Sequence, residues 1–148
     1  MYSRKKLEEI FQENDLKKLD IALSSIGDEL EYSNLTSAEV ISIVNYFFGC
    51  IRNYTSETII ENILNICLRI MNAHTVFRGF NLDLVLPYVR TMSTGCSSYV
   101  LTFLGFSGDI KYEKTIESFL QNDSLKEDAE EALLELRYSV KRNYTIPH

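Results

Sequence analysis

The two histidines and Cys96 are the side chains in this sequence best suited to catalysis. A histidine can act as a general acid or base, or as a metal ligand, when a second functional group is placed beside it. His148 ends the sequence in a segment without a core pattern, and His74 follows a strongly apolar segment with no partner residue in view. We therefore interpret His74 as a solvated or helix-capping residue.

The three cysteines are better explained as buried hydrophobic residues than as catalytic or metal-binding residues. Cys96 begins a predicted helix beside Ser97 and Ser98, where the helix dipole can lower the pKa of a thiol, but no base accompanies it. Cys50, Cys67 and Cys96 are odd in number and fall within apolar helical runs, which is typical of small buried hydrophobes. We expect no catalytic residue, no metal site and no cofactor.

Carboxylates outside the apolar stripes of the helices are the most informative polar residues. Several glutamates and two tyrosines lie off these stripes, and helices stacked in one layer would bring them onto a concave wall of negative potential. The alternative is that each glutamate simply lies on the solvent-exposed face of its helix and has no binding role. The residues predicted to bind a partner are Glu61, Asn65, Tyr99, Glu127, Glu130, Glu131, Glu135 and Tyr138.

The composition indicates one acidic domain. The chain has 148 residues, 45% of them hydrophobic, with a net charge of −6 and a pI near 5.0. That charge argues against nucleic acid, which selects clustered Lys and Arg, and favours a basic protein partner. No segment resembles a signal peptide or a membrane span, so we expect a cytoplasmic protein that acts as a monomer or in a 1:1 complex.

A fourfold apolar pattern predicts the elements that position these residues. Hydrophobic or small residues at i, i+3, i+4 and i+7 form one stripe on a helix. The second members of the four copies, Ala22, Ile63, Val100 and Ala132, stand 41, 37 and 32 residues apart, which is typical of stacked helical repeats. The prediction is an all-α fold over residues 1–148, a two-layer α-solenoid of about four antiparallel helical hairpins with a frayed tail at 141–148.

Capping and breaking residues predict where individual helices begin and end. Gly27 is expected to stop the second helix and to open a loop over 28–35. Thr36 and Glu39 form a capping box, and Pro87 should bend or break the fifth helix. The predicted helices are 4–12, 15–26, 36–51, 56–70, 82–92, 96–106, 112–121 and 125–140.

The final third of the chain resembles a HEAT-type repeat. The resemblance rests on the segments 116–123 and 125–136, the second of which contains the pattern Ala129-x-x-Ala132-Leu133. In its size, acidity and helical form the chain is also similar to small HEAT-like immunity proteins of bacterial polymorphic toxin systems, including contact-dependent growth inhibition. This second resemblance implies a non-enzymatic antitoxin that covers a basic toxin domain, for example a nuclease.

Two other functions remain open at this point. A HEAT-like adaptor could bind a host protein or peptide along the same acidic face. A helical-repeat base-excision glycosylase would need a basic groove, whereas this chain is acidic and contains no tryptophan. The sequence therefore favours a binding protein over an enzyme.

Overall fold

The computed structural model describes the backbone of residues 3–145 and the side chains of residues 3–141. This part of the chain is helical and contains no β-strand, as the repeated apolar pattern predicts. The α-helices are α1 (Arg4–Ile10), α2 (Leu16–Tyr32), α3 (Ser37–Cys50), α4 (Glu57–His74), α5 (Thr94–Phe106), α6 (Glu113–Glu117) and α7 (Lys126–Thr145). The 3₁₀ helices are η1 (Ile51–Asn53), η2 (Leu82–Leu84), η3 (Leu86–Thr91) and η4 (Ile110–Tyr112).

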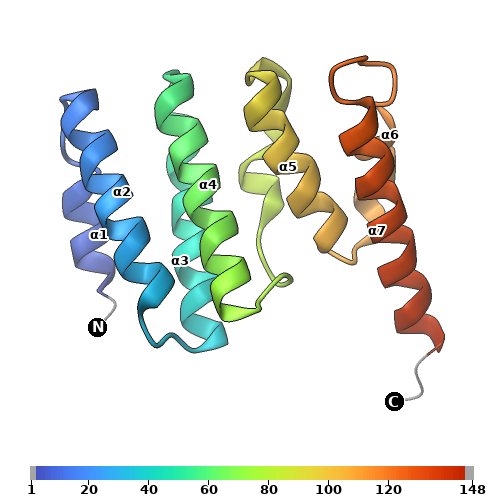
Figure 1. Cartoon of the computed structure of the whole chain (residues 1–148), viewed down its shortest axis with the longest axis horizontal. Coiled ribbons are helices and arrows are strands. Elements are labelled where there is room, and N and C mark those ends of the chain that lie inside the picture. Colours follow the sequence, from blue (N-terminus) through green and yellow to red (C-terminus); the bar gives the residue numbers. More distant parts are fainter. Residues whose placement is uncertain (1–2, 146–148) are drawn as a thin grey trace.

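Four long helices lie side by side in the order α2, α4, α5 and α7 (Figure 1). Behind this row, α1 packs against α2, α3 against α4, and α6 against α7. The row consists of the four helices that carry the repeated apolar pattern. Each contacts the next, so the pattern marks the residues through which neighbouring helices are packed together.

A single hydrophobic core runs between the row and the helices behind it. Leu19, Leu23, Ile63, Val100 and Leu136, all members of the repeated pattern, are fully or almost fully buried. Each amphipathic helix alone would expose its apolar stripe to water, so stabilisation comes mainly from burial of that stripe against neighbouring helices. The core extends from Leu7 in α1 to Leu136 in α7 without a break.

The prediction that Gly27 ends the second helix is wrong. Helix α2 continues to Tyr32, and Gly27 is a buried residue within it. A Cβ atom at this position would lie 2.8 Å from Cγ1 of Ile66 in α4, closer than atoms of this kind approach. The glycine therefore permits close packing of two helices, and the predicted loop is helical as far as Tyr32.

Several predicted boundaries are confirmed at the level of single residues. Thr36 accepts a hydrogen bond from the Glu39 backbone, and the Glu39 carboxylate accepts one from the Thr36 backbone, so the capping box is formed. At the start of α4, the Ser56 hydroxyl accepts a hydrogen bond from the Ile59 backbone. Pro87 lies in the first turn of η3, and the segment 82–92 forms two 3₁₀ helices in place of an α-helix.

The last two predicted helices differ in length from expectation. The predicted helix 112–121 is reduced to α6, and the Ser118 hydroxyl beyond it donates to the Thr115 carbonyl, which competes with further helical bonding. Helix α7 extends through Thr145, so the frayed tail expected from Lys141 onwards is helical over 141–145. Residues 146–148, including His148, lie outside the described part of the chain.

Candidate protein-binding groove

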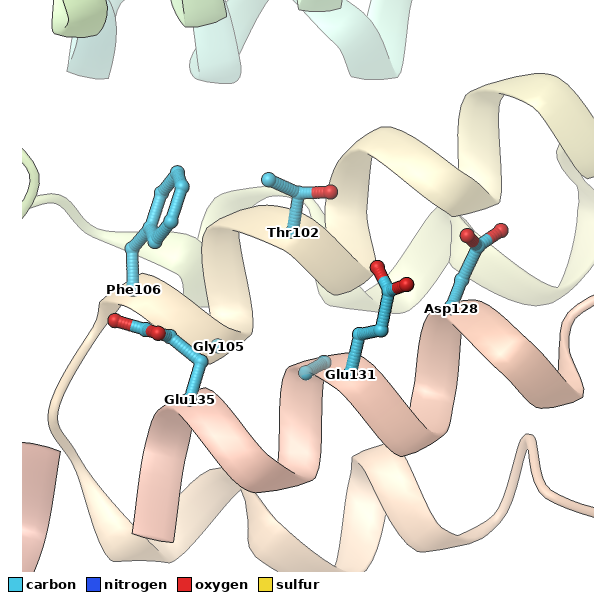
Figure 2. A pocket seen from close by; sticks show the side chains of 7 residues that line it. Thr102, Gly105, Phe106, Asp128, Glu131 and Glu135 are labelled. Atoms are coloured by element: carbon cyan, nitrogen blue, oxygen red, sulfur yellow. The ribbon is translucent and has the colours of Figure 1, made fainter. Parts of the chain in front are cut away.

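A groove lies along the line where α5 meets α7. It encloses a cavity of about 230 Å³ with small residues at its base and carboxylates along one wall. Its lining consists of Thr102, Gly105, Phe106, Asp128, Glu131, Ala132 and Glu135. The labelled side chains from both helices project to the same side of the pair (Figure 2).

Two small residues bring the helices together beneath the groove. A Cβ atom on Gly105 would lie 3.0 Å from Cα of Ala132 and 3.2 Å from its carbonyl oxygen. A side chain larger than hydrogen would be tight there, so the glycine lets α5 and α7 approach closely and longer side chains flank the contact. Phe106 closes one side, where its ring packs edge-on against Phe77 with centroids 5.1 Å apart.

Three carboxylates give this groove its charge. Asp128, Glu131 and Glu135 follow the spacing i, i+3 and i+7, which places them on one side of α7. Within the described part of the chain, none of the three forms an ion pair or a side-chain hydrogen bond, and α5 contributes no charged side chain. The groove therefore carries negative charge that no described cation offsets.

At the contact between α2 and α4, by contrast, a basic side chain pairs with the neighbouring carboxylates. Arg69 of α4 binds both Asp28 and Glu31 of α2, and these hydrogen bonds raise the pKa of its guanidinium above the usual value. Both acidic residues thus have an internal partner. The carboxylates between α5 and α7 have no such partner among the described residues.

Only part of the predicted partner-binding set converges on the groove. Glu131 and Glu135 line it, whereas Glu127 and Tyr138 are exposed on α7 without lining it. Glu130 lies about 200° around the helix from Asp128. It shares a side with Arg137, which binds Glu113 of α6 at 2.9 Å, so Glu130 faces away from the groove.

The other predicted residues form a link between helices. The side-chain amide of Asn65 in α4 donates a hydrogen bond of 3.0 Å to the Tyr99 hydroxyl in α5, and both residues are half-buried. Glu61 is exposed on α4 and is not part of this link. The pair Asn65 and Tyr99 connects neighbouring helices of the row.

Five residues that line the groove lie outside the predicted partner-binding set: Thr102, Gly105, Phe106, Asp128 and Ala132. Asp128 is off the apolar stripe, and its spacing to Glu131 and Glu135 identifies it as a member of the same row. Thr102 and Phe106 carry no comparable signal, because their place in the groove depends on how α5 rotates against α7. Only packed helices define that rotation.

The structure buries the three cysteines and places His74 against α2. Burial raises the pKa of the Cys50 thiol to about 11 and also raises those of Cys67 and Cys96, so the reactive thiolate is disfavoured at all three positions. Nε2 of His74 lies 2.9 Å from the Leu30 carbonyl oxygen, against α2. Residues 3–141 contain no group of three or more His, Cys, Asp or Glu side chains that could hold a metal ion.

Comparisons with known proteins do not identify a relative. The chain matches no family model, and no curated protein and no solved structure is significantly similar to it. In the described part, no helix combines the length and the apolar character needed to cross a bilayer.

Proposed function

We propose that this protein is a non-enzymatic binding protein whose groove between α5 and α7 holds a basic segment of another protein. In the specific form that we favour, it is a cytoplasmic immunity protein that binds and occludes a basic toxin domain such as a nuclease. We further propose that its helices form a two-layer, HEAT-like α-solenoid of about four hairpins. The resemblance noted from the sequence and the row of four long helices support this assignment.

One observation carries the proposal: three carboxylates line a cavity without a cation among the described residues. Bringing Asp128, Glu131 and Glu135 together on one side of α7 costs electrostatic repulsion. A Lys or Arg side chain of a partner would relieve that repulsion and would form charge-assisted hydrogen bonds with the carboxylates. Phe106 and the methyl group of Thr102 offer apolar contact to the stem of such a side chain.

Inhibition by this route requires no chemistry. The acidic groove would accelerate encounter with a cationic domain through long-range attraction, and the bound protein would then cover the surface that the toxin uses. The affinity would depend on the few carboxylates that lose water on binding, because exposed charges at the rim of an interface contribute little.

Co-expression with the product of the adjacent upstream gene tests the proposal. We expect the two products to co-purify, and expression of this chain to restore growth to cells that carry the upstream product. Glu131→Gln together with Glu135→Gln should weaken the affinity by about tenfold or more, mostly through faster dissociation, because the partner's cation loses its charge-assisted hydrogen bonds. The matched control, Glu9→Gln with Asp123→Asn, makes the same change in net charge at exposed positions outside the groove and should leave the affinity within about twofold.

Two results would contradict the proposal. Equal losses of affinity in the groove variant and in its control would show that only net charge matters. Rescue of growth without any complex would show that protection does not depend on binding. A complex with a protein from another locus, with no effect on growth, would favour the adaptor function.

A further inference from the structure

Helix α7 exposes an apolar strip on the side that faces away from the core. Leu134 is 70% exposed and Tyr138 is 62% exposed. The two residues are four positions apart, so they lie one above the other on the helix surface. Together they form what we call the outer strip of α7.

Among the described residues, no other helix covers the outer strip. α7 is the last described helix of the row, and it packs against α5 and α6 (Figure 1). Neither Leu134 nor Tyr138 belongs to the hydrophobic core or to the partly buried side chains packed against it. The strip therefore contributes little to folding and exposes apolar area that binding could remove from water.

On the side of α7 that faces the groove, the charged residues next to the outer strip are carboxylates. Glu131 precedes Leu134 by three residues and Glu135 precedes Tyr138 by three, so each apolar residue has a carboxylate one turn away. Arg137, the cation between them in sequence, is held by Glu113 of α6. Glu130, four residues before Leu134, adds a carboxylate on the side away from the groove. The strip thus adjoins the acidic groove and has carboxylates on both of its sides.

We propose that the outer strip docks an amphipathic, basic helix of the partner. Its apolar stripe would pack on Leu134 and Tyr138, and Lys or Arg residues beside that stripe would reach Glu131 and Glu135. Charge complementarity selects this occupant, because an acidic or neutral helix would leave those carboxylates unpaired beside a dry contact. The inference rests on the proposed function and names the part of the partner that this site recognises.

Two synthetic peptides of about 18 residues provide the test, since that length permits several helical turns. Both contain the same numbers of Leu and Lys. In one, the leucines follow the spacing i, i+3, i+4 and i+7, and in the other they are distributed around the helix. Fluorescence anisotropy with labelled peptides, at about 0.15 M salt, compares their affinities for the whole protein.

We expect the amphipathic peptide to bind about tenfold more tightly than its permuted counterpart. Leu134→Ser with Tyr138→Ser should abolish that difference without changing the circular dichroism spectrum, because both side chains are exposed. Ile21→Ser is the control: Ile21 is 71% exposed on α2, at the other end of the row, and its substitution should leave both affinities unchanged.

The outcomes separate this inference from the proposed function. If both peptides bind equally and the serine variant loses nothing, the outer strip is not a docking site, while a loss with Glu131→Gln and Glu135→Gln still supports the acidic groove. If only the serine variant loses affinity, the strip is supported and the groove is not. A dimer in sedimentation that the serine substitutions dissociate would assign the strip to a second copy of this chain and overturn the inference.

Discussion

The Cα atom of Ala132 lies 3.0 Å from the point that a Cβ atom would occupy on Gly105. At this contact the backbones of α5 and α7 approach closely, with only the Ala132 methyl group beside them. The contact brings the walls of the acidic groove to their observed separation, because Thr102 and Phe106 on one helix and the three carboxylates on the other flank it. The geometry of the candidate site therefore depends on one glycine in α5.

Gly105→Ala should destabilise the protein by about 1–3 kcal/mol, since the added methyl group meets backbone atoms that cannot move aside locally. Gly49→Ala is the matched control. A Cβ atom at Gly49 in α3 meets no other atom within 4 Å, so alanine there should stabilise the helix by about 0.5–1 kcal/mol. Urea denaturation measures both variants, and equal stabilisation by both would show that α5 and α7 are further apart than described.

Tyr99→Phe should reduce the free energy of unfolding by about 0.5–1.5 kcal/mol, because the Asn65 amide loses its acceptor in α5. In a double-mutant cycle with Asn65→Ala, the two losses should not add, since both remove the same hydrogen bond. Tyr32→Phe, at an 85% exposed tyrosine, is the control and should be neutral. Fully additive losses would show that the pair does not interact in solution.

Arg69→Met should cost about 1 kcal/mol, since exposed ion pairs contribute modestly and Arg69 remains partly accessible to water. High salt screens these pairs, so the difference from the unsubstituted protein should shrink when denaturation is repeated at about 1 M NaCl. Arg52→Met, which removes an exposed arginine that forms no described ion pair, is the control and should show no salt-dependent difference. A cost that is independent of salt would indicate that Arg69 acts through packing.

The free energy of unfolding should fall as the pH rises from about 9 to about 11. Burial raises the pKa of Cys50 from 9.0 to about 11, so in this range the unfolded chain releases a proton that the folded chain retains. Stability from this group is therefore full below pH 9 and decreases toward pH 11. Raised pKa values of Cys67 and Cys96, again caused by burial, act in the same direction.

Urea midpoints at several pH values measure this fall. Cys50→Ala should make the dependence on pH shallower, because one of the retained protons is removed. Cys50→Ala also leaves a small cavity, so the relevant quantity is the slope with pH and not the stability at one pH. An unchanged slope would show that the Cys50 thiol does not titrate with a raised pKa in the folded protein.

Local sequence signals predicted most of the helices, because the interactions that form a helix act between residues within one or two turns of each other. The spacing of Leu19, Leu23, Ile63 and Leu136 determines a helical stripe wherever these segments lie, and all four residues are buried. Pro87 lacks a backbone donor in any context, and it lies in the first turn of η3, where the segment 82–92 forms 3₁₀ helices and no α-helix.

Local sequence signals gave wrong predictions where the structure depends on contacts between segments that are distant in sequence. Glycine often ends a helix, but Gly27 lies within α2, where the absence of a side chain makes room for Ile66 of α4. Packing between the two helices therefore outweighs the preference of glycine for a helix end. The acidic residues of α7 are evident in the sequence, whereas their division into groove and outer face depends on the rotation of α7 against α5. The close contact of Gly105 with Ala132 defines that rotation, and two residues so far apart in sequence are brought together only by the tertiary fold.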